Sequence, residues 1–162
     1  MAEDQVVRKT FNEDLDVNSR VAEGGILARL YLEVQGNDKD AAKNALDGTV
    51  FGKMNAEPMA KLLEVSLYDI QKSEDNQFFS GVAEVKLIAD DFRGFVNIAM
   101  RYGPTGIEII KPETVKLDSD DMHALAGDVS SMMQLFSNQI ISMLNDPERA
   151  ALYQQMLAKT KE

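Results

Sequence analysis

The sequence contains no cysteine. Disulfides, thiolate metal sites, iron–sulfur clusters and a cysteine nucleophile are therefore excluded, since each of them needs a thiol or thiolate. A chain without disulfides suits a reducing compartment, and its polar, acidic N-terminus is unlike a secretory signal, so we expect a cytoplasmic protein. The single histidine, His123, has only Asp120 and Asp121 beside it. One imidazole with carboxylates makes a poor metal site, so we expect a surface histidine and no metal.

Basic clusters and long apolar runs are also missing. The net charge is −10, and the nearest approach to a basic run is Arg8-Lys9. Such a chain repels phosphates, so we expect no nucleic-acid partner. No stretch approaches the roughly 18 apolar residues of a spanning helix, so we expect no membrane partner. With 162 residues, 44% hydrophobic and 27% charged, the composition is that of a globular domain able to bury its own core.

Catalytic patterns are absent as well. Residues 48–53, GTVFGK, lack the spacing of a phosphate-binding loop and the hydroxyl after the lysine. The carboxylates at 90–91 and 118–121 stand at predicted helix starts, where capping explains acidic residues. The serines at 130–131 have no nucleophile-elbow motif around them. We therefore expect no enzyme and no cofactor.

The most informative stretch is residues 83–117, which predicts a strand, a helix, a tight turn and a strand. Apolar and polar residues alternate before Asp90-Asp91, either of which can cap the helix that follows. Gly103 stands where a left-handed helix cap is needed, and Pro104 ends the helix. A short alternating strand follows around Ile109. The apolar stripe of the predicted helix consists of Phe92, Phe95, Val96, Ala99 and Met100.

The segment before this stretch predicts the other half of the same sheet. Residues 26–35 alternate cleanly, as a half-buried strand does. The expected elements are a strand at 26–35, a helical piece around 41–46 that Gly48 breaks, a second helical piece around 56–63, a strand at 64–71, a hairpin loop at 73–76 and a strand at 78–88. Together they predict an α+β fold with a ferredoxin-like βαββαβ antiparallel sheet and helices on one face.

Residues 83–117 also resemble a known module. Tyr102-Gly103-Pro104, Ile107-Glu108-Ile109 and Pro112-Glu113 follow the order found in the C-terminal extension domain of WYL-type transcription regulators. The resemblance implies a ferredoxin-like accessory module. No helix-turn-helix pattern and no WYL tripeptide occur, so it does not extend to the DNA-binding and ligand-sensing parts. The strand order also resembles that of ACT-type domains.

A long helix from Asp118 or Ser119 to about residue 144 is expected next, and another capped by Asp146. The long one would span about 40 Å, more than a small sheet can cover. Its apolar stripe is Met122, Leu125, Val129, Met132, Phe136, Ile140 and Met143. Methionine, present nine times, suits either an ordinary core or an adaptable surface. We expect a homodimer or higher homo-oligomer with Met132, Phe136, Ile140 and Met143 at the interface.

The predicted organisation is a single domain, 1–162, with an N-terminal arm (1–23), a ferredoxin-like core (24–117) and a helical extension (118–162). The predicted function is a non-enzymatic, self-associating interaction or regulatory module, for which a larger protein is a further candidate partner. The alternative is a small-molecule-sensing, ACT-like domain with its ligand at a subunit interface.

A small anionic-ligand corner is predicted beside the helix in residues 83–117, because arginine is a usual anion ligand. Ordinary solvated helix positions are the alternative interpretation. The residues of this corner are Arg93, Arg101, Tyr102 and Gly103.

Overall fold

The computed structural model of the protein describes residues 7–75, 77–144 and 146–160. The chain divides into two compact units, residues 1–117 and 118–162. Parts of the predicted N-terminal arm (1–6) and of the predicted hairpin loop (Asn76) lie outside the described residues. The organisation as a single domain stays a prediction.

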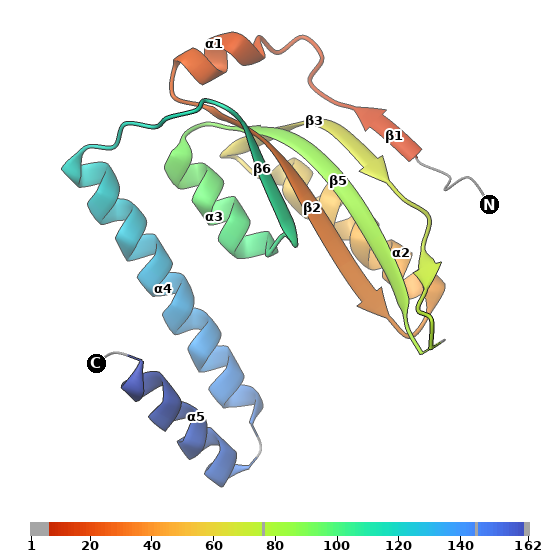
Figure 1. Ribbon diagram of the computed structural model, residues 1–162, viewed down its shortest axis with the longest axis vertical. Helices are drawn as coiled ribbons and strands as arrows, with labels where there is room; N and C mark the ends of the chain where they lie inside the picture. The colour runs from red at the N-terminus through yellow and green to blue at the C-terminus, as the bar shows by residue number, and fades with distance from the viewer. Residues whose placement is uncertain (1–6, 76, 145, 161–162) are drawn as a thin grey trace. The chain divides into compact units, whose positions relative to one another are not determined.

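The first unit is an α+β fold with an antiparallel sheet, as predicted, and this sheet has six strands (Figure 1). The strand order is β1-β3-β5-β2-β6, and β4 pairs with β5. The sheet therefore has two strands more than predicted, β1 from the N-terminal arm and the short β4. The strands are β1 (Val7–Thr10), β2 (Ile26–Gly36), β3 (Ala60–Leu67), β4 (Gln71–Lys72), β5 (Phe79–Ala89) and β6 (Gly106–Lys111).

Alternation in the middle of the central strands sorts side chains to the two faces of the sheet. On β2, Ala28, Leu30 and Leu32 are buried, whereas Arg29 and Glu33 point to the other face. The register pairs buried residues with buried residues across the strands, because opposite residues of an antiparallel pair share a face. The core residues of the central strands are Ile26, Ala28, Leu30, Leu32, Leu62, Val65, Ala83, Val85, Leu87 and Ala89.

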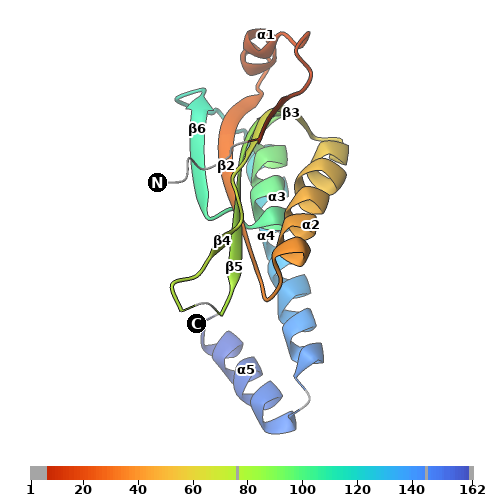
Figure 2. The same ribbon diagram turned by 90° about the vertical axis from the view of Figure 1, so that its right-hand side faces the viewer.

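Two helices, α2 (Lys39–Asp47) and α3 (Phe92–Tyr102), cover that apolar face. Both lie on the same side of the sheet when it is seen edge-on (Figure 2). A carboxylate starts each helix: Asp38 accepts the Ala41 N–H at 2.8 Å, and Asp91 accepts the Gly94 N–H at 2.7 Å. The other described helix of this unit, α1 (Val17–Ala22), precedes β2.

The end of α3 follows the sequence prediction. Its cap, Gly103, has φ +53° and ψ +53°, the left-handed conformation that favours glycine. Its buried apolar residues are Phe95, which belongs to the predicted stripe, and Ile98, which does not.

The connection after α2 differs from the prediction. Gly48 does not break the helix, because it keeps right-handed helical angles (φ −64°, ψ −37°) and the chain continues as a wide π-helical turn and a tight 3₁₀ turn. These are η1 (Gly48–Lys53) and η2 (Met54–Ala56). The helical piece predicted at 56–63 is wrong. Glu57 is extended, as expected before Pro58, and β3 begins four residues earlier than predicted.

The second unit consists of two helices, α4 (Ser119–Met143) and α5 (Pro147–Lys159). Asp118 and Asp121 form a capping box at the start of α4, since each side chain accepts the backbone N–H of the other. Asp146 and Pro147 start α5 in the predicted way. None of the residues of these two helices is buried.

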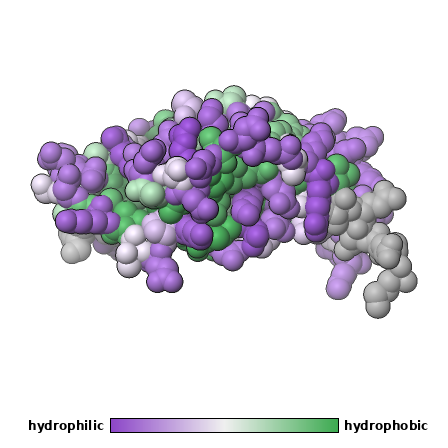
Figure 3. Space-filling model, turned by 90° about the horizontal axis from the view of Figure 1, so that it is seen from above, coloured by the Kyte–Doolittle hydropathy of each residue, from purple (hydrophilic) through white to green (hydrophobic). Residues whose placement is uncertain are grey.

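Hydrophilic residues cover most of the surface seen in Figure 3, and apolar residues appear among them as patches. This matches the balance of charged and apolar residues in the sequence.

Phe95 gives a direct test of the packing of α3 on the sheet. It is 4% exposed and belongs to the core cluster. We predict that Phe95→Ala lowers the free energy of unfolding by about 3–5 kcal/mol, because apolar burial is lost and a cavity remains. Chemical denaturation measures this loss. Phe78→Ala is the matched control, since Phe78 is 44% exposed and should change stability little. A Phe95→Ala midpoint equal to that of the unmodified protein would contradict the packing.

Candidate functional site

Glu57 anchors a polar cluster between the start of β3 and the end of α3. Its side chain is 6% exposed. Its Oε1 accepts two hydrogen bonds of 2.6 Å each, from Arg101 Nη1 and from Tyr102 Oη. Its Oε2 is buried and has no hydrogen-bond partner among the described residues. A buried carboxylate held by a guanidinium and a phenol joins two segments that lie far apart in the sequence.

The protonation of this cluster follows from its contacts. Burial alone would raise the pKa of Glu57, but the hydrogen bonds from Tyr102 and Arg101 outweigh it, so the pKa lies below its ordinary value. Burial and the neighbouring carboxylate raise the pKa of Tyr102 to about 12. The hydrogen bond to Glu57 raises the pKa of Arg101. The cluster is therefore a carboxylate, a neutral phenol and a guanidinium near neutral pH.

The predicted anionic-ligand corner falls on this cluster in part. Arg101 and Tyr102 do converge, but the carboxylate between them is Glu57 of the same chain. Gly103 caps α3, and Arg93 stands in the first turn of that helix. Ligand binding by these residues stays a prediction. A ligand bound there would contact Arg101, which already pairs with the carboxylate of Glu57. Nothing in the sequence around Glu57 indicated this role, because its partners lie more than 40 positions away.

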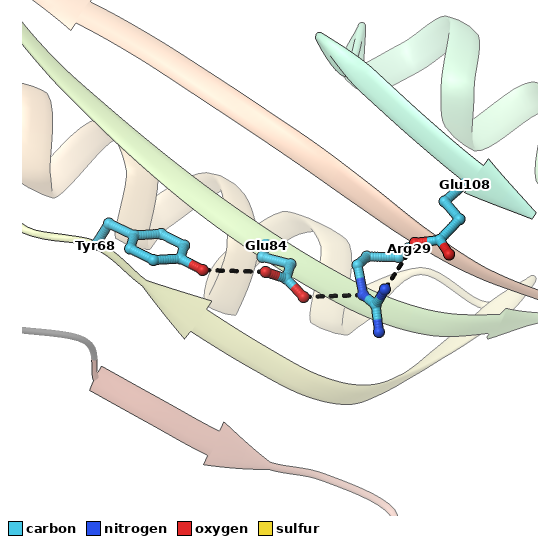
Figure 4. Close-up of polar contacts among 4 residues, drawn as sticks. All are labelled: Arg29, Tyr68, Glu84 and Glu108. Atoms are coloured by element: carbon cyan, nitrogen blue, oxygen red, sulfur yellow. Dashed lines mark hydrogen bonds and ion pairs between the residues drawn. The ribbon is translucent and has the colours of Figure 1, made fainter. Parts of the chain in front are cut away.

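A second polar network crosses the sheet on the face away from α2 and α3 (Figure 4). Arg29 on β2 lies between two carboxylates: its Nη1 donates to Glu108 Oε2 on β6 at 2.6 Å, and its Nε is 2.8 Å from Glu84 Oε1 on β5. The Nε–H is not directed at Glu84, so this second contact is an ion pair rather than a hydrogen bond. Tyr68 Oη donates to Glu84 Oε2 at 3.1 Å, and this bond raises the pKa of Tyr68.

This network adds charged side chains to the face of the sheet away from α2 and α3. That face is therefore more polar than its apolar residues alone would make it. The apolar and aromatic residues of that face include Tyr31, Tyr68 and Val82, which are partly buried, and Ile88, which is 3% exposed. The ion pairs of Arg29 stand at the centre of this face and are partly exposed. Charges already paired across strands can remain in water. The requirement for a covering element is therefore weaker here than on the other face.

No group of three or more potential ligands among the described residues could hold a metal ion. Within the same ranges no helix is both long and apolar enough to cross a membrane.

The helix α4 carries many exposed apolar side chains outside the core. In the predicted stripe, Phe136 and Ile140 are each 41% exposed and Met143 is 78% exposed, while Met132 is half-buried. The exposed large apolar residues of α4 are Met122, Val129, Met133, Leu135, Phe136, Ile140 and Met143.

The neighbouring helix α5 does not cover this stripe. A groove of about 520 Å³ runs between α4 and α5. Its lining on α4 mixes polar and apolar residues, and this side lies roughly a third of the way round the helix from the stripe. The lining residues are Ser130, Met133, Gln134, Ser137, Asn138, Ile141, Leu157 and Thr160. The helix α5 therefore packs along a side of α4 other than the stripe and leaves the stripe open.

The protein is thus an α+β sheet protein with a helical unit that carries an open apolar stripe. The chain belongs to the MJ0538 family, whose model matches residues 27–155. It is 29% identical over 104 residues to "Uncharacterized protein MJ0538" of Methanocaldococcus jannaschii, an alignment that covers 64% of this chain and 39% of that protein. The chain therefore matches less than half the length of this relative. No solved structure matches the chain significantly.

The Glu57 cluster gives a pH-dependent prediction. Because the pKa of Glu57 is lowered by folding, its contribution to stability is full above its ordinary value of 4.5 and is lost as the pH falls below it. We expect Glu57→Gln to lower the free energy of unfolding by about 1–3 kcal/mol at neutral pH. The gap to the unmodified protein should shrink in acid. Denaturation curves at several pH values test this, with the exposed Glu113→Gln as control. A gap that stays constant with pH would contradict the role of the carboxylate.

Proposed function

We propose that this protein is a non-enzymatic, self-associating interaction module, and that α4 carries the contact between two copies. The observation that supports the proposal most is the open stripe of α4, which α5 leaves exposed. Isolated helices rarely hold their structure by backbone propensity alone and depend on packing of an apolar face. Neither α4 nor α5 has a buried residue, so the two helices do not provide this packing for each other.

The apolar side chains of the stripe are exposed along the length of α4. Met122, Val129, Phe136, Ile140 and Met143 are each 40–78% exposed, and Leu125 and Met132 are partly buried. Monomers seldom keep a contiguous apolar patch made of several such side chains in water. A second copy is the simplest occupant, since a twofold contact buries both stripes with one self-complementary surface.

Other parts of the proposal follow from the fold. The order β3-β5-β2-β6, with α2 and α3 on one face, supports a ferredoxin-like core to which β1 and β4 are additions. Such a core suits a regulatory role in which α4 forms the dimer contact and the sheet unit is attached to it. A larger protein partner and a cytoplasmic location, the latter suggested by the cysteine-free sequence, belong to the same proposal.

Charged substitutions in the stripe test the proposal. We predict that Phe136→Glu and Ile140→Glu each convert the assembly to a monomer or an aggregate, because a carboxylate in an apolar interface is left unpaired. Static light scattering after gel filtration measures the mass against the 18.0 kDa of one chain. Leu135→Glu is the matched control. Leu135 is 52% exposed on the same helix but lies outside the stripe, so this variant should keep the mass of the unmodified protein.

Two results would contradict the proposal. One is a monodisperse 18.0 kDa species for the unmodified chain at high concentration, which would show that the stripe is covered within one chain. The other is an equal loss of assembly in all three variants, which would show that the effect is one of added charge and not of position.

A further inference from the structure

The distribution of charge along α4 is uneven in a way that bears on how two copies meet. The first third of the helix and its cap are strongly acidic, whereas residues 129–143 carry no charged side chain. The acidic residues are Asp118, Asp120, Asp121 and Asp128. The next charges are at the start of α5, where Arg149 Nε lies 3.7 Å from Asp146 Oδ2 and Glu148 stands between them.

We propose that the two α4 helices pair antiparallel, centred between Met132 and Met133; this inference rests on the self-association proposed above. Parallel pairing would bring the acidic ends of both copies together, and like charges within a Debye length of about 10 Å repel one another. Antiparallel pairing places each acidic end beside the uncharged half of the other copy. The charge pattern therefore favours the antiparallel arrangement.

The sizes of the stripe residues favour the same register. Val129 and Phe136 stand at equal distances on either side of the centre, so the smallest stripe residue of one copy meets the largest of the other. Likewise Leu125 meets Ile140, and Met122 meets Met143. Complementary large and small side chains fill an interface without voids or clashes. A parallel pair would set Phe136 against Phe136 and Val129 against Val129.

The absence of cysteine allows a clean test by single substitutions in the full chain. Disulfides need Cα atoms about 4.4–6.8 Å apart. In the antiparallel register, Met132→Cys puts both thiols next to the twofold axis, and we expect this variant to form a covalent dimer on mild oxidation. Met122→Cys alone, or Met143→Cys alone, separates the two thiols by about 31 Å along the helix at 1.5 Å per residue. Neither should crosslink, whereas an equimolar mixture of these two variants should.

Ser131→Cys is the control, since Ser131 is exposed on the opposite side of the helix from the stripe. It should stay monomeric on a non-reducing gel. Light scattering of each reduced variant establishes that the assembly is intact before oxidation.

The outcomes separate this inference from the proposed function. Crosslinking at Met122, Met132 and Met143 alike would show parallel pairing, which overturns the register and leaves self-association standing. A dimeric mass without crosslinks at any of these positions would show that another surface makes the contact. A monomeric mass together with no crosslinks would overturn both proposals.

Discussion

Removing apolar surface from water is the constraint on which both parts of this protein depend, and they meet it differently. The sheet unit meets it internally, because alternating strands turn one apolar face toward α2 and α3 and bury a continuous core. The α4–α5 unit does not, because α5 packs along a different side of α4 from the stripe and neither helix has a buried residue. Because the stripe of α4 is open, we propose that two copies of the protein associate through it.

Polar contacts have a different role in the sheet unit, since they fix positions more than they supply stability. Glu57 ties the entry to β3 to the end of α3, and its burial requires both Arg101 and Tyr102. Arg29 ties β5 and β6 to the strand between them. The second network is partly exposed, so its ion pairs contribute little free energy but keep the open face compatible with water.

Much of this structure could be predicted from local patterns. The alternation in β2, the cap at Asp91, the left-handed Gly103 and the capped start of α4 all depend on neighbours in the sequence. The prediction that Gly48 breaks the helix was wrong. Tertiary packing of Val50 and Met54 keeps this glycine helical, although glycine has a low helix propensity. The Glu57 cluster and the Arg29 network could not be predicted either, because these join residues brought together only by the fold. The apolar stripe of α4 was predictable because helical periodicity is a local property.

The central claim is that the stripe of α4 is covered by a second copy and not by its own chain. Hydrogen exchange of the backbone amides, followed over a wide range of protein concentration, tests it most directly. Dimerisation is favoured by mass action, so protection of amides in α4 should rise with concentration. Amides in β2 and β5, whose packing lies within one chain, should exchange at a constant rate. Protection of α4 that does not change with concentration would contradict the account.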